Sequence, residues 1–307
     1  MDTNPVSRSG FSGVYPMLFA FFGKDEQLDR GAMRRQVDGL VAAGVHGIAA
    51  LGLATECNKL SVTEKRRLLD WVVEDLNGRL PLSVTVSEPD VAGQIEFVKA
   101  AAAAGAGWVV LQPPPVRGVP EGELLRFFGA VADAAPVPVG LQIAPELLGI
   151  GLSGATLKEL ARRHPNVRIL KVEATPLEVD ALIDATEGAF DVFNGRAGLE
   201  LPDCIRAGCV GMIPGAECAD VLTRIFDTMR AGDAASVEQA ERDYLAVASL
   251  ITFCFASIDS FLVYAKRVAA RRLGIGEDLA LPRRPFTPAS TFGLALSRRH
   301  SAALGPL

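Results

Sequence analysis

Apolar residues along this chain fall into short dense runs that alternate with longer amphipathic stretches. A run such as Trp108–Gln112 shows no polar alternation, which is typical of a strand buried on both faces. A stretch such as Ser61–Leu76 spaces its apolar residues at helical intervals and opens on a Ser61–Glu64 capping-box pattern. The predicted strands cover residues 14–22, 47–52, 82–87, 108–112, 137–145, 167–174, 190–194 and 210–214.

A helical stretch follows each predicted strand, and this alternation over about 230 residues predicts an α/β fold, a (β/α)8 TIM barrel with a C-terminal helical extension. A doubly wound open sheet is the alternative, but no GxGxxG motif follows the first strand. We expect the barrel over residues 11–232 and the helical extension, packed on the barrel, over 233–275. The Pro-, Arg- and Ser-rich residues 276–307 are expected to form a loosely ordered tail.

Composition narrows the possible partners. The 307 residues are 49% hydrophobic and carry a net charge of −5 with no basic stripe, so nucleic acid is not an expected partner. Residues 1–12 contain no signal-peptide pattern, which predicts a cytoplasmic protein. The longest apolar run, Leu245–Ile258, is too short to span a bilayer, so no membrane partner is expected either. The five cysteines and three histidines show no metal-ligand spacing, so we expect no metal and no cofactor.

The predicted sixth strand carries a lysine, Lys171, followed two residues later by Glu173. Lysine is unusual in a buried strand because its ammonium group is costly to desolvate. Burial favours the neutral amine, which is the form that attacks a ketone to give a Schiff base. Side chains alternate along a strand, so Lys171 and Glu173 face the same side. The alternative for Lys171 is an edge-strand lysine or a structural ion pair with Glu173.

In a barrel of this type the active site lies at the C-terminal ends of the strands. Several candidate residues stand at those ends. They are the turn Gly52–Glu56 after the second strand, Gln142 on the fifth, Lys171 and Glu173 on the sixth, Asn194 and Arg196 after the seventh, and Gly215 after the eighth.

The order of these motifs resembles the dihydrodipicolinate synthase / N-acetylneuraminate lyase family, over about residues 11–275. The resemblance rests on GxxxE at Gly52–Glu56, a proline near the end of the fourth strand, an xxxP turn on the fifth, and K-x-E at Lys171–Glu173. It implies a (β/α)8 barrel, a homotetramer, and a Schiff base between Lys171 and a 2-oxo acid. The turn Gly52–Glu56 would hold the substrate carboxylate through N–H groups and hydroxyls.

This sequence also departs from the family pattern. Gln142 stands where the family has its proton-shuttle tyrosine, and Leu53 and Ala54 replace two hydroxyl-bearing residues. A glutamine amide does not titrate, so it cannot act as a general acid or base. We therefore do not expect this chain to be the lysine-pathway synthase. Glu173 and Glu56 are the candidates for moving protons in place of the tyrosine.

Arg196 stands where sugar-acid aldolases of the family tend to have an acidic residue. A guanidinium there favours a second anionic group on the substrate. The alternative for Arg196 is a salt bridge to Glu200 or Glu217.

The preferred hypothesis is a class I lyase or aldolase acting on a 2-oxo acid. Lys171 forms the imine, Glu173 moves protons, and Gln142 orients substrate or water. The residues expected to bind substrate are Gly52, Ala54, Thr55, Glu56, Asn194, Arg196 and Gly215. Two alternatives remain open: a dehydratase or deaminase working through the same imine, and a non-catalytic homologue that only binds an oxo acid. A phosphate-binding barrel is less favoured because no clear phosphate motif follows the seventh or eighth strand.

Overall fold

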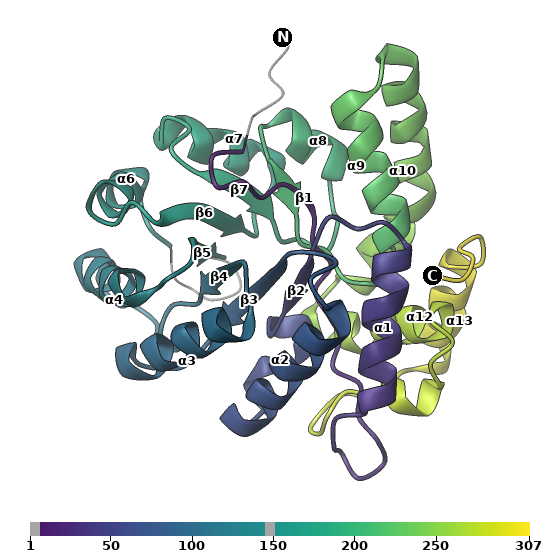
Figure 1. Cartoon of the computed structure of the whole chain (residues 1–307). Helices are drawn as coiled ribbons and strands as arrows, with labels where there is room; N and C mark the ends of the chain where they lie inside the picture. Colours follow the sequence, from purple (N-terminus) through teal and green to yellow (C-terminus); the bar gives the residue numbers. More distant parts are fainter. Residues whose placement is uncertain (1–6, 145–150) are drawn as a thin grey trace.

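The computed structural model describes residues 7–144 and 151–307. Within them, eight strands run parallel: β1 (Gly13–Val14), β2 (Ile48–Ala50), β3 (Leu82–Val86), β4 (Trp108–Leu111), β5 (Val139–Ile143), β6 (Val167–Val172), β7 (Asp191–Asn194) and β8 (Gly211–Met212). They form one sheet in the order β1-β8-β7-β6-β5-β4-β3-β2. Met17 bridges in parallel to Ala49 and to Gly215, so the two edges of the sheet meet. The TIM barrel predicted from the sequence is confirmed (Figure 1).

Helices surround the sheet on its outer side (Figure 1). They are α1 (Arg30–Ala42), α2 (Val62–Leu76), α3 (Val91–Ala104), α4 (Glu121–Ala134), α6 (Gly154–Arg163), α7 (Pro176–Ala185), α8 (Leu201–Arg206) and α9 (Ala219–Ala231). The predicted capping box of α2 is present: the Ser61 hydroxyl accepts from the Glu64 N–H, and the Glu64 carboxylate accepts from the Ser61 N–H.

The first predicted strand is much shorter in the structure than the sequence indicates. The run 14–22 pairs as a regular strand only over Gly13–Val14, because Pro16 has no N–H to donate and the chain then changes partner. Met17 N–H still bonds to the β8 side, at Pro214 O, whereas Leu18 N–H bonds to Ala49 O of β2. The strand expected at 137–145 is observed as β5, and residue 145 lies outside the described residues.

Aromatic rings fill the interior of the barrel. The rings of Tyr15, Trp108 and Phe193 pack against one another with centroids 5.2–5.8 Å apart, and all three side chains are buried. Phe193 pairs in register with Lys171 on the neighbouring strand. The packed core therefore continues up to the level of the lysine.

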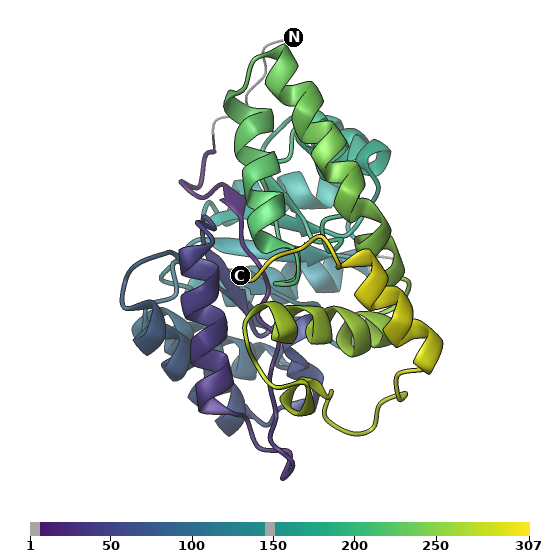
Figure 2. The same cartoon turned by 90° about the vertical axis from the view of Figure 1, so that its right-hand side faces the viewer.

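After the barrel, the chain forms the expected helical extension. It consists of α10 (Ala234–Cys254), the short α11 (Ile258–Ser260), a π-helical turn η3 (Phe261–Ala265) and α12 (Lys266–Arg272). Figure 2 shows α10 running alongside α9. Phe255 and Phe261 pack edge to face where the chain bends back between α10 and α12. The exact boundaries predicted for the barrel and the extension stay predictions.

Residues 276–307, expected to form a loosely ordered tail, contain two helical segments. They form η4 (Glu277–Ala280) and α13 (Thr291–His300). The carbonyl oxygens of Arg283 and Pro285 accept hydrogen bonds from Lys59 Nζ, at 2.6 and 3.0 Å. Leu307 N–H bonds to Arg272 O. The carbonyl groups of Arg283 and Pro285 thereby satisfy the half-buried ammonium group of Lys59.

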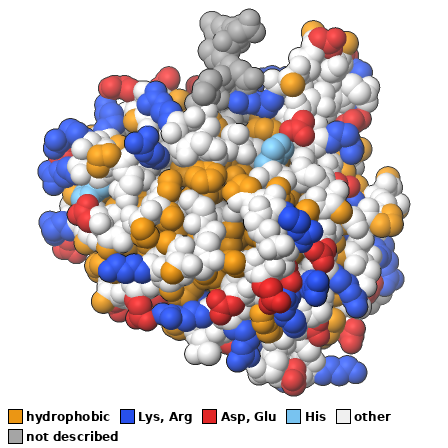
Figure 3. All heavy atoms as spheres, viewed as in Figure 1, with side chains coloured by type: hydrophobic (Ala, Val, Ile, Leu, Met, Phe, Trp, Pro, Cys, Tyr) orange, Lys and Arg blue, Asp and Glu red, His pale blue; other side chains and the backbone are white. Residues whose placement is uncertain are grey.

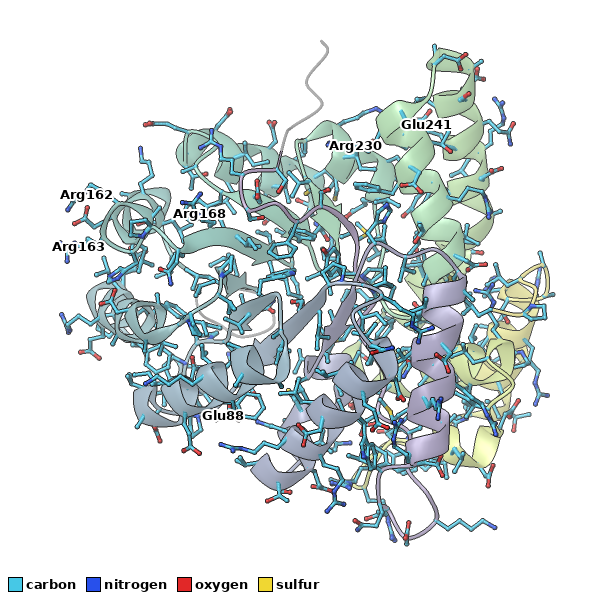
Figure 4. All side chains as sticks on the ribbon, viewed as in Figure 1. Glu88, Arg162, Arg163, Arg168, Arg230 and Glu241 are labelled. Carbon is cyan, nitrogen blue, oxygen red and sulfur yellow. The ribbon has the colours of Figure 1, made fainter. Side chains whose placement is uncertain are left out.

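Charged side chains of both signs are interspersed around the rim of the face seen in Figure 1, and apolar side chains gather nearer its centre (Figure 3). Arg162 and Arg163 on α6 pair with Glu159 and point away from the barrel (Figure 4). In the described part of the chain, no single helix is long and apolar enough to cross a membrane. The pair formed by α10 and the stretch Ile258–Arg272 meets the length and composition criteria only when joined, and it is bent by 111°.

Candidate active site

Lys171 lies near the C-terminal end of β6, in register with Gln142 of β5. It is only 6% exposed, and its Nζ lies 3.3 Å from Oε1 of Glu173. The same oxygen accepts a hydrogen bond from Nε2 of Gln142 at 2.9 Å. The three residues predicted to carry the chemistry therefore form one buried cluster.

A cavity of about 40 Å³ opens beside this cluster, with room for about three water-sized groups. Lys171 and Glu173 are its ionisable lining residues among those described. The rest of the wall is mainly apolar and includes Phe255, Ile258 and Phe261 from the helical extension. The extension therefore covers the mouth of the barrel and keeps the lysine in an environment poor in water.

A larger cavity, of about 220 Å³, adjoins the first and shares Glu173, Phe255 and Ile258 with it. Arg196 lines this second cavity. Its Nη1 lies 2.6 Å from Oε2 of Glu200, so one of the alternative ion pairs foreseen for Arg196 is present. The guanidinium is still 21% exposed, which leaves donors for a ligand in the larger cavity.

The turn after β2 reaches the smaller cavity with only part of its predicted residues. Leu53 and Ala54 line the wall. Among the described residues, no acceptor bonds to their backbone N–H groups, which suits them to an anion. Gly52 does not line the cavity, and its N–H contacts the Met17 sulfur at 3.2 Å.

Thr55 was expected to offer its hydroxyl to the substrate carboxylate, and in the structure this residue does not line the cavity. The side chain is fully buried, and Oγ1 donates to Leu18 O at 2.6 Å and accepts from Leu51 N–H. Its single hydroxyl proton is thus used to tie the turn to the barrel.

Glu56 was expected to bind substrate or move protons, and it too lies outside the cavity. Its backbone is left-handed (φ 54°), and its buried carboxylate accepts from Lys266 Nζ at 2.9 Å, from Arg283 N–H at 2.9 Å and from Lys59 Nζ at 3.2 Å. A buried charge of this kind requires partners, and the tail and α12 provide them. The structure assigns Glu56 to this ion cluster.

Asn194 and Gly215 have contrasting positions. Asn194 is buried and does not line the cavity: its Nδ2 donates to Ala174 O, and its Oδ1 accepts from Arg196 N–H, both at 2.9 Å. It therefore positions the loop that carries Arg196. Gly215 lines the cavity directly but brings no side chain to it.

One residue at this end of the barrel was missed as a site candidate. Glu217 is fully buried, and neither carboxyl oxygen has a hydrogen-bond partner in the described residues. Burial raises the pKa of this carboxyl to about 7, and its own backbone amide and the Arg272 guanidinium oppose that rise. The sequence signal was a lone glutamate between an apolar strand and an apolar helix.

Metal ligands do not gather anywhere in the described chain. No group of three or more His, Cys, Asp or Glu side chains is arranged to hold an ion there. The five cysteines are buried and unpaired by disulfides.

Comparison with known proteins shows to which family this barrel belongs. The model of the dihydrodipicolinate synthetase family matches residues 10–294. The chain belongs to this family. At the level of the family it is therefore a lyase or aldolase.

Individual members of the dihydrodipicolinate synthetase family resemble the chain at low identity. The 4-hydroxy-tetrahydrodipicolinate synthase of Stenotrophomonas maltophilia is 31% identical over 278 residues, which cover 90% of this chain and 91% of the relative. The putative 2-dehydro-3-deoxy-D-gluconate aldolase YagE of Escherichia coli is 29% identical over 191 residues, covering 62% of this chain and 63% of YagE. The crystal structure of YagE in complex with pyruvate superposes with a TM-score of 0.85 at 24% identity, covering 95% and 98% of the two chains.

Proposed function

We propose that this chain is a Schiff-base lyase or aldolase that acts on a 2-oxo acid. The observation that carries the proposal is Lys171, a buried amine that lines a small cavity beside a carboxylate. The amine attacks C2 of the oxo acid, and Glu173, 3.3 Å away, accepts the proton that the ammonium form must lose first. The resulting imine withdraws electrons from C3, which permits cleavage or formation of a carbon–carbon bond.

The substrate carboxylate is proposed to bind at the turn after β2. Leu53 and Ala54 line this part of the cavity, and their N–H groups have no acceptor among the described residues. Backbone N–H groups at the start of a helical turn are suited to binding an anion. Gln142, whose Oε1 has no partner in the described chain, would orient the substrate or a water molecule.

A second anionic group on the substrate would extend into the larger cavity and meet Arg196. This arrangement suits a longer oxo acid, because the cavity beside Lys171 holds only about three water-sized groups. Two structural neighbours, YagE and a synthase from Acinetobacter baumannii, are described as complexes with pyruvate, which supports an oxo acid as the ligand class.

Reduction with borohydride tests the proposal. Incubation with pyruvate or 2-oxoglutarate followed by reduction should add the mass of the reduced oxo acid to the peptide that contains Lys171. Lys65 provides an internal control, since it is equally buried and also ion-paired, with Glu88 at 2.9 Å, but does not line the cavity; it should stay unmodified. Lys171→Met should abolish the adduct. An absence of adduct across a broad panel of oxo acids would overturn the Schiff-base proposal.

The product analysis separates the alternatives. Loss of water or ammonia from the trapped acid indicates a dehydratase or deaminase, and release of an aldehyde indicates an aldolase. A non-catalytic homologue is favoured by the replacement of hydroxyls at Leu53 and Ala54, and it predicts thermal stabilisation by oxo acids without any adduct. We do not propose the lysine-pathway synthase, because Gln142 cannot titrate. The homotetramer and the cytoplasmic location stay predictions.

A further inference from the structure

Glu217 is a buried carboxyl that neither the fold nor the proposed chemistry has so far used. It follows β8 by five residues and precedes α9. Arg272 does not pair with its side chain: Nη1 donates to the backbone oxygen of Glu217 at 2.7 Å, and the guanidinium pairs with Asp220. Burying a carboxyl without partners is unfavourable by several kcal/mol, so a group of this kind calls for an explanation.

The position of the carboxyl is defined by its contact with Gly215. The consecutive residues Ile213, Pro214 and Gly215, which follow β8, all line the Lys171 cavity. A Cβ atom placed on Gly215 would clash with Oε2 of Glu217 and lie 2.6 Å from Cζ of Phe261. The carboxyl of Glu217 therefore occupies the inward space of a side chain at 215. Gly215 and Phe261, its neighbours at this point, both line the cavity.

The surroundings of Glu217 favour its protonated form. Arg272 and Asp220 neutralise each other in an ion pair at 2.7 Å. The other ionisable neighbours are Cys218 and Cys254, and burial raises the pKa of both thiols. No neighbouring cation in the described chain bonds to the carboxyl oxygens, so a proton is what balances their charge.

Glu173, which lines the cavity itself, stands in the opposite environment. Its Oε1 accepts from Gln142 and faces the Lys171 ammonium. Two carboxyls around one reaction space, one with polar partners and one without, are arranged as a base and an acid. The missing tyrosine leaves the acid role vacant, and Glu217 is suited to it.

We propose that Glu217 donates the proton to the hydroxyl group that leaves when the oxo acid condenses with Lys171. This role rests on the Schiff-base function proposed above. Once Nζ has bonded to C2, the intermediate is a carbinolamine. The C2–O bond breaks with its electron pair moving to oxygen, Glu217 protonates that oxygen, and water leaves as the nitrogen lone pair forms the C=N bond. Glu217, then a carboxylate, regains a proton from the water that adds to C2 when the imine hydrolyses.

Gly215 and Phe261 stand in the cavity wall next to the carboxyl of Glu217. Gly215 has no side chain to block rotation of the carboxyl into the cavity. Phe261 is the other side chain at this point, and it begins the π-helical turn η3. Such turns occur frequently at functional sites, where they allow a local shift of the helix.

Exchange of the pyruvate carbonyl oxygen with labelled water tests this role without knowledge of the natural substrate. Each cycle of imine formation and hydrolysis replaces that oxygen. Mass spectrometry of pyruvate in water labelled with a heavy oxygen isotope therefore gives the exchange rate, after subtraction of the enzyme-free exchange.

The wild-type exchange rate should fall as the pH rises through about 7, where Glu217 loses its proton. Glu217→Gln should slow the exchange by about 100-fold or more and remove this pH dependence, because general acids contribute about that much. The amount of borohydride-trapped adduct at equilibrium should not change.

Cys254→Ala is the matched control, because it disturbs packing next to the carboxyl and keeps the carboxyl itself. It should exchange at the wild-type rate. Equal loss in both variants, or an unchanged rate in Glu217→Gln, would overturn the proposal. If Glu217→Gln does not fold, the wild-type profile decides, since a rate that does not fall near pH 7 contradicts the role. A wild-type protein that forms no adduct at all rejects the Schiff-base function itself, which is a separate outcome.

Discussion

Gln142 donates a hydrogen bond from Nε2 to Oε1 of Glu173 at 2.9 Å, and that oxygen also lies 3.3 Å from Lys171 Nζ. The amide fixes the orientation of the carboxylate toward the amine. Gln142 therefore need not titrate to affect the reaction, because it can act by positioning Glu173.

Replacing Gln142 by leucine should lower the rate of adduct formation at Lys171 by about 10- to 100-fold. A hydrogen bond to a charged group contributes about 1.5–3 kcal/mol, and its loss leaves Glu173 free to turn away from the amine. Time points of borohydride trapping with pyruvate measure the rate. Gln94→Leu is the matched control, because Gln94 is an equally buried glutamine that bonds to the main chain at Glu88 and Gln112. It should lower stability and leave the trapping rate unchanged, and an equal effect of both substitutions would contradict the positioning role.

Arg196 should distinguish oxo acids by their second charge. Arg196→Gln is expected to weaken binding of 2-oxoglutarate by about 10- to 100-fold, the range that a charge-assisted hydrogen bond provides, and to leave pyruvate binding within about twofold. Titration calorimetry on the Lys171→Met background measures binding without reaction. Arg206→Gln is the control, since Arg206 pairs with Asp203 and Glu241 away from both cavities. Equal losses for the two acids would show that Arg196 stabilises the loop only.

The sequence predicted the barrel and the position of Lys171 well, and for a physical reason. Buried parallel strands leave a dense apolar pattern, and a lysine in such a strand is conspicuous against it. The alternation of side chains along β6 then predicted that Glu173 lies on the same side as Lys171. In the structure, both residues line one cavity. These predictions needed only local rules.

Thr55 and Glu56 could not be placed correctly by the same rules. Their partners come from far along the chain: Thr55 bonds to Leu18, and Glu56 bonds to Lys266 and Arg283. No periodicity connects Thr55 to a residue 37 positions away, or Glu56 to residues more than 200 positions away. Glu217 was overlooked as a site candidate for a related reason, because its carboxyl fills the space of a different residue, Gly215.

Lys266 should be important for stability, in contrast to surface lysines. It is fully buried, and its Nζ donates to Glu56 and to Leu281 O, both at 2.9 Å. Lys266→Met is expected to lower the free energy of unfolding by about 3–5 kcal/mol, because it removes the main partner of a buried carboxylate. Lys158→Met removes an exposed pair with Glu187 and should change it by less than about 1 kcal/mol. Urea denaturation measures both, and similar values for the two variants would contradict the structural role of the buried cluster.

Glu217 should make the stability of the wild-type protein depend on pH. Its pKa is about 7 in the folded state and near the ordinary 4.5 when unfolded, so the folded protein holds a proton that the unfolded chain releases in between. The free energy of unfolding therefore falls as the pH rises from about 4.5 to about 7, by about 3 kcal/mol from this group. The side chain at this position cannot titrate in Glu217→Gln. The free energy of unfolding of this variant, taken relative to wild type, should therefore rise by about that amount between about pH 5 and about pH 8. Denaturation curves at the two pH values give the difference, and a constant gap would mean that the carboxyl ionises normally.

A double-mutant cycle should show that Glu217 fills the side-chain space of Gly215. Gly215→Ala alone should lower the free energy of unfolding by about 1–3 kcal/mol, because the new Cβ meets Oε2 of Glu217 and Cζ of Phe261. In a Glu217→Ala background the same substitution should be at least about 1 kcal/mol less destabilising, since one of the two obstacles is gone. Gly211→Ala is the matched control in β8, where the new Cβ meets Gly13 O and the Phe193 ring. Its effect should be identical in both backgrounds, and a Gly215 effect that is also identical in both would show that the carboxyl does not stand at the cavity wall.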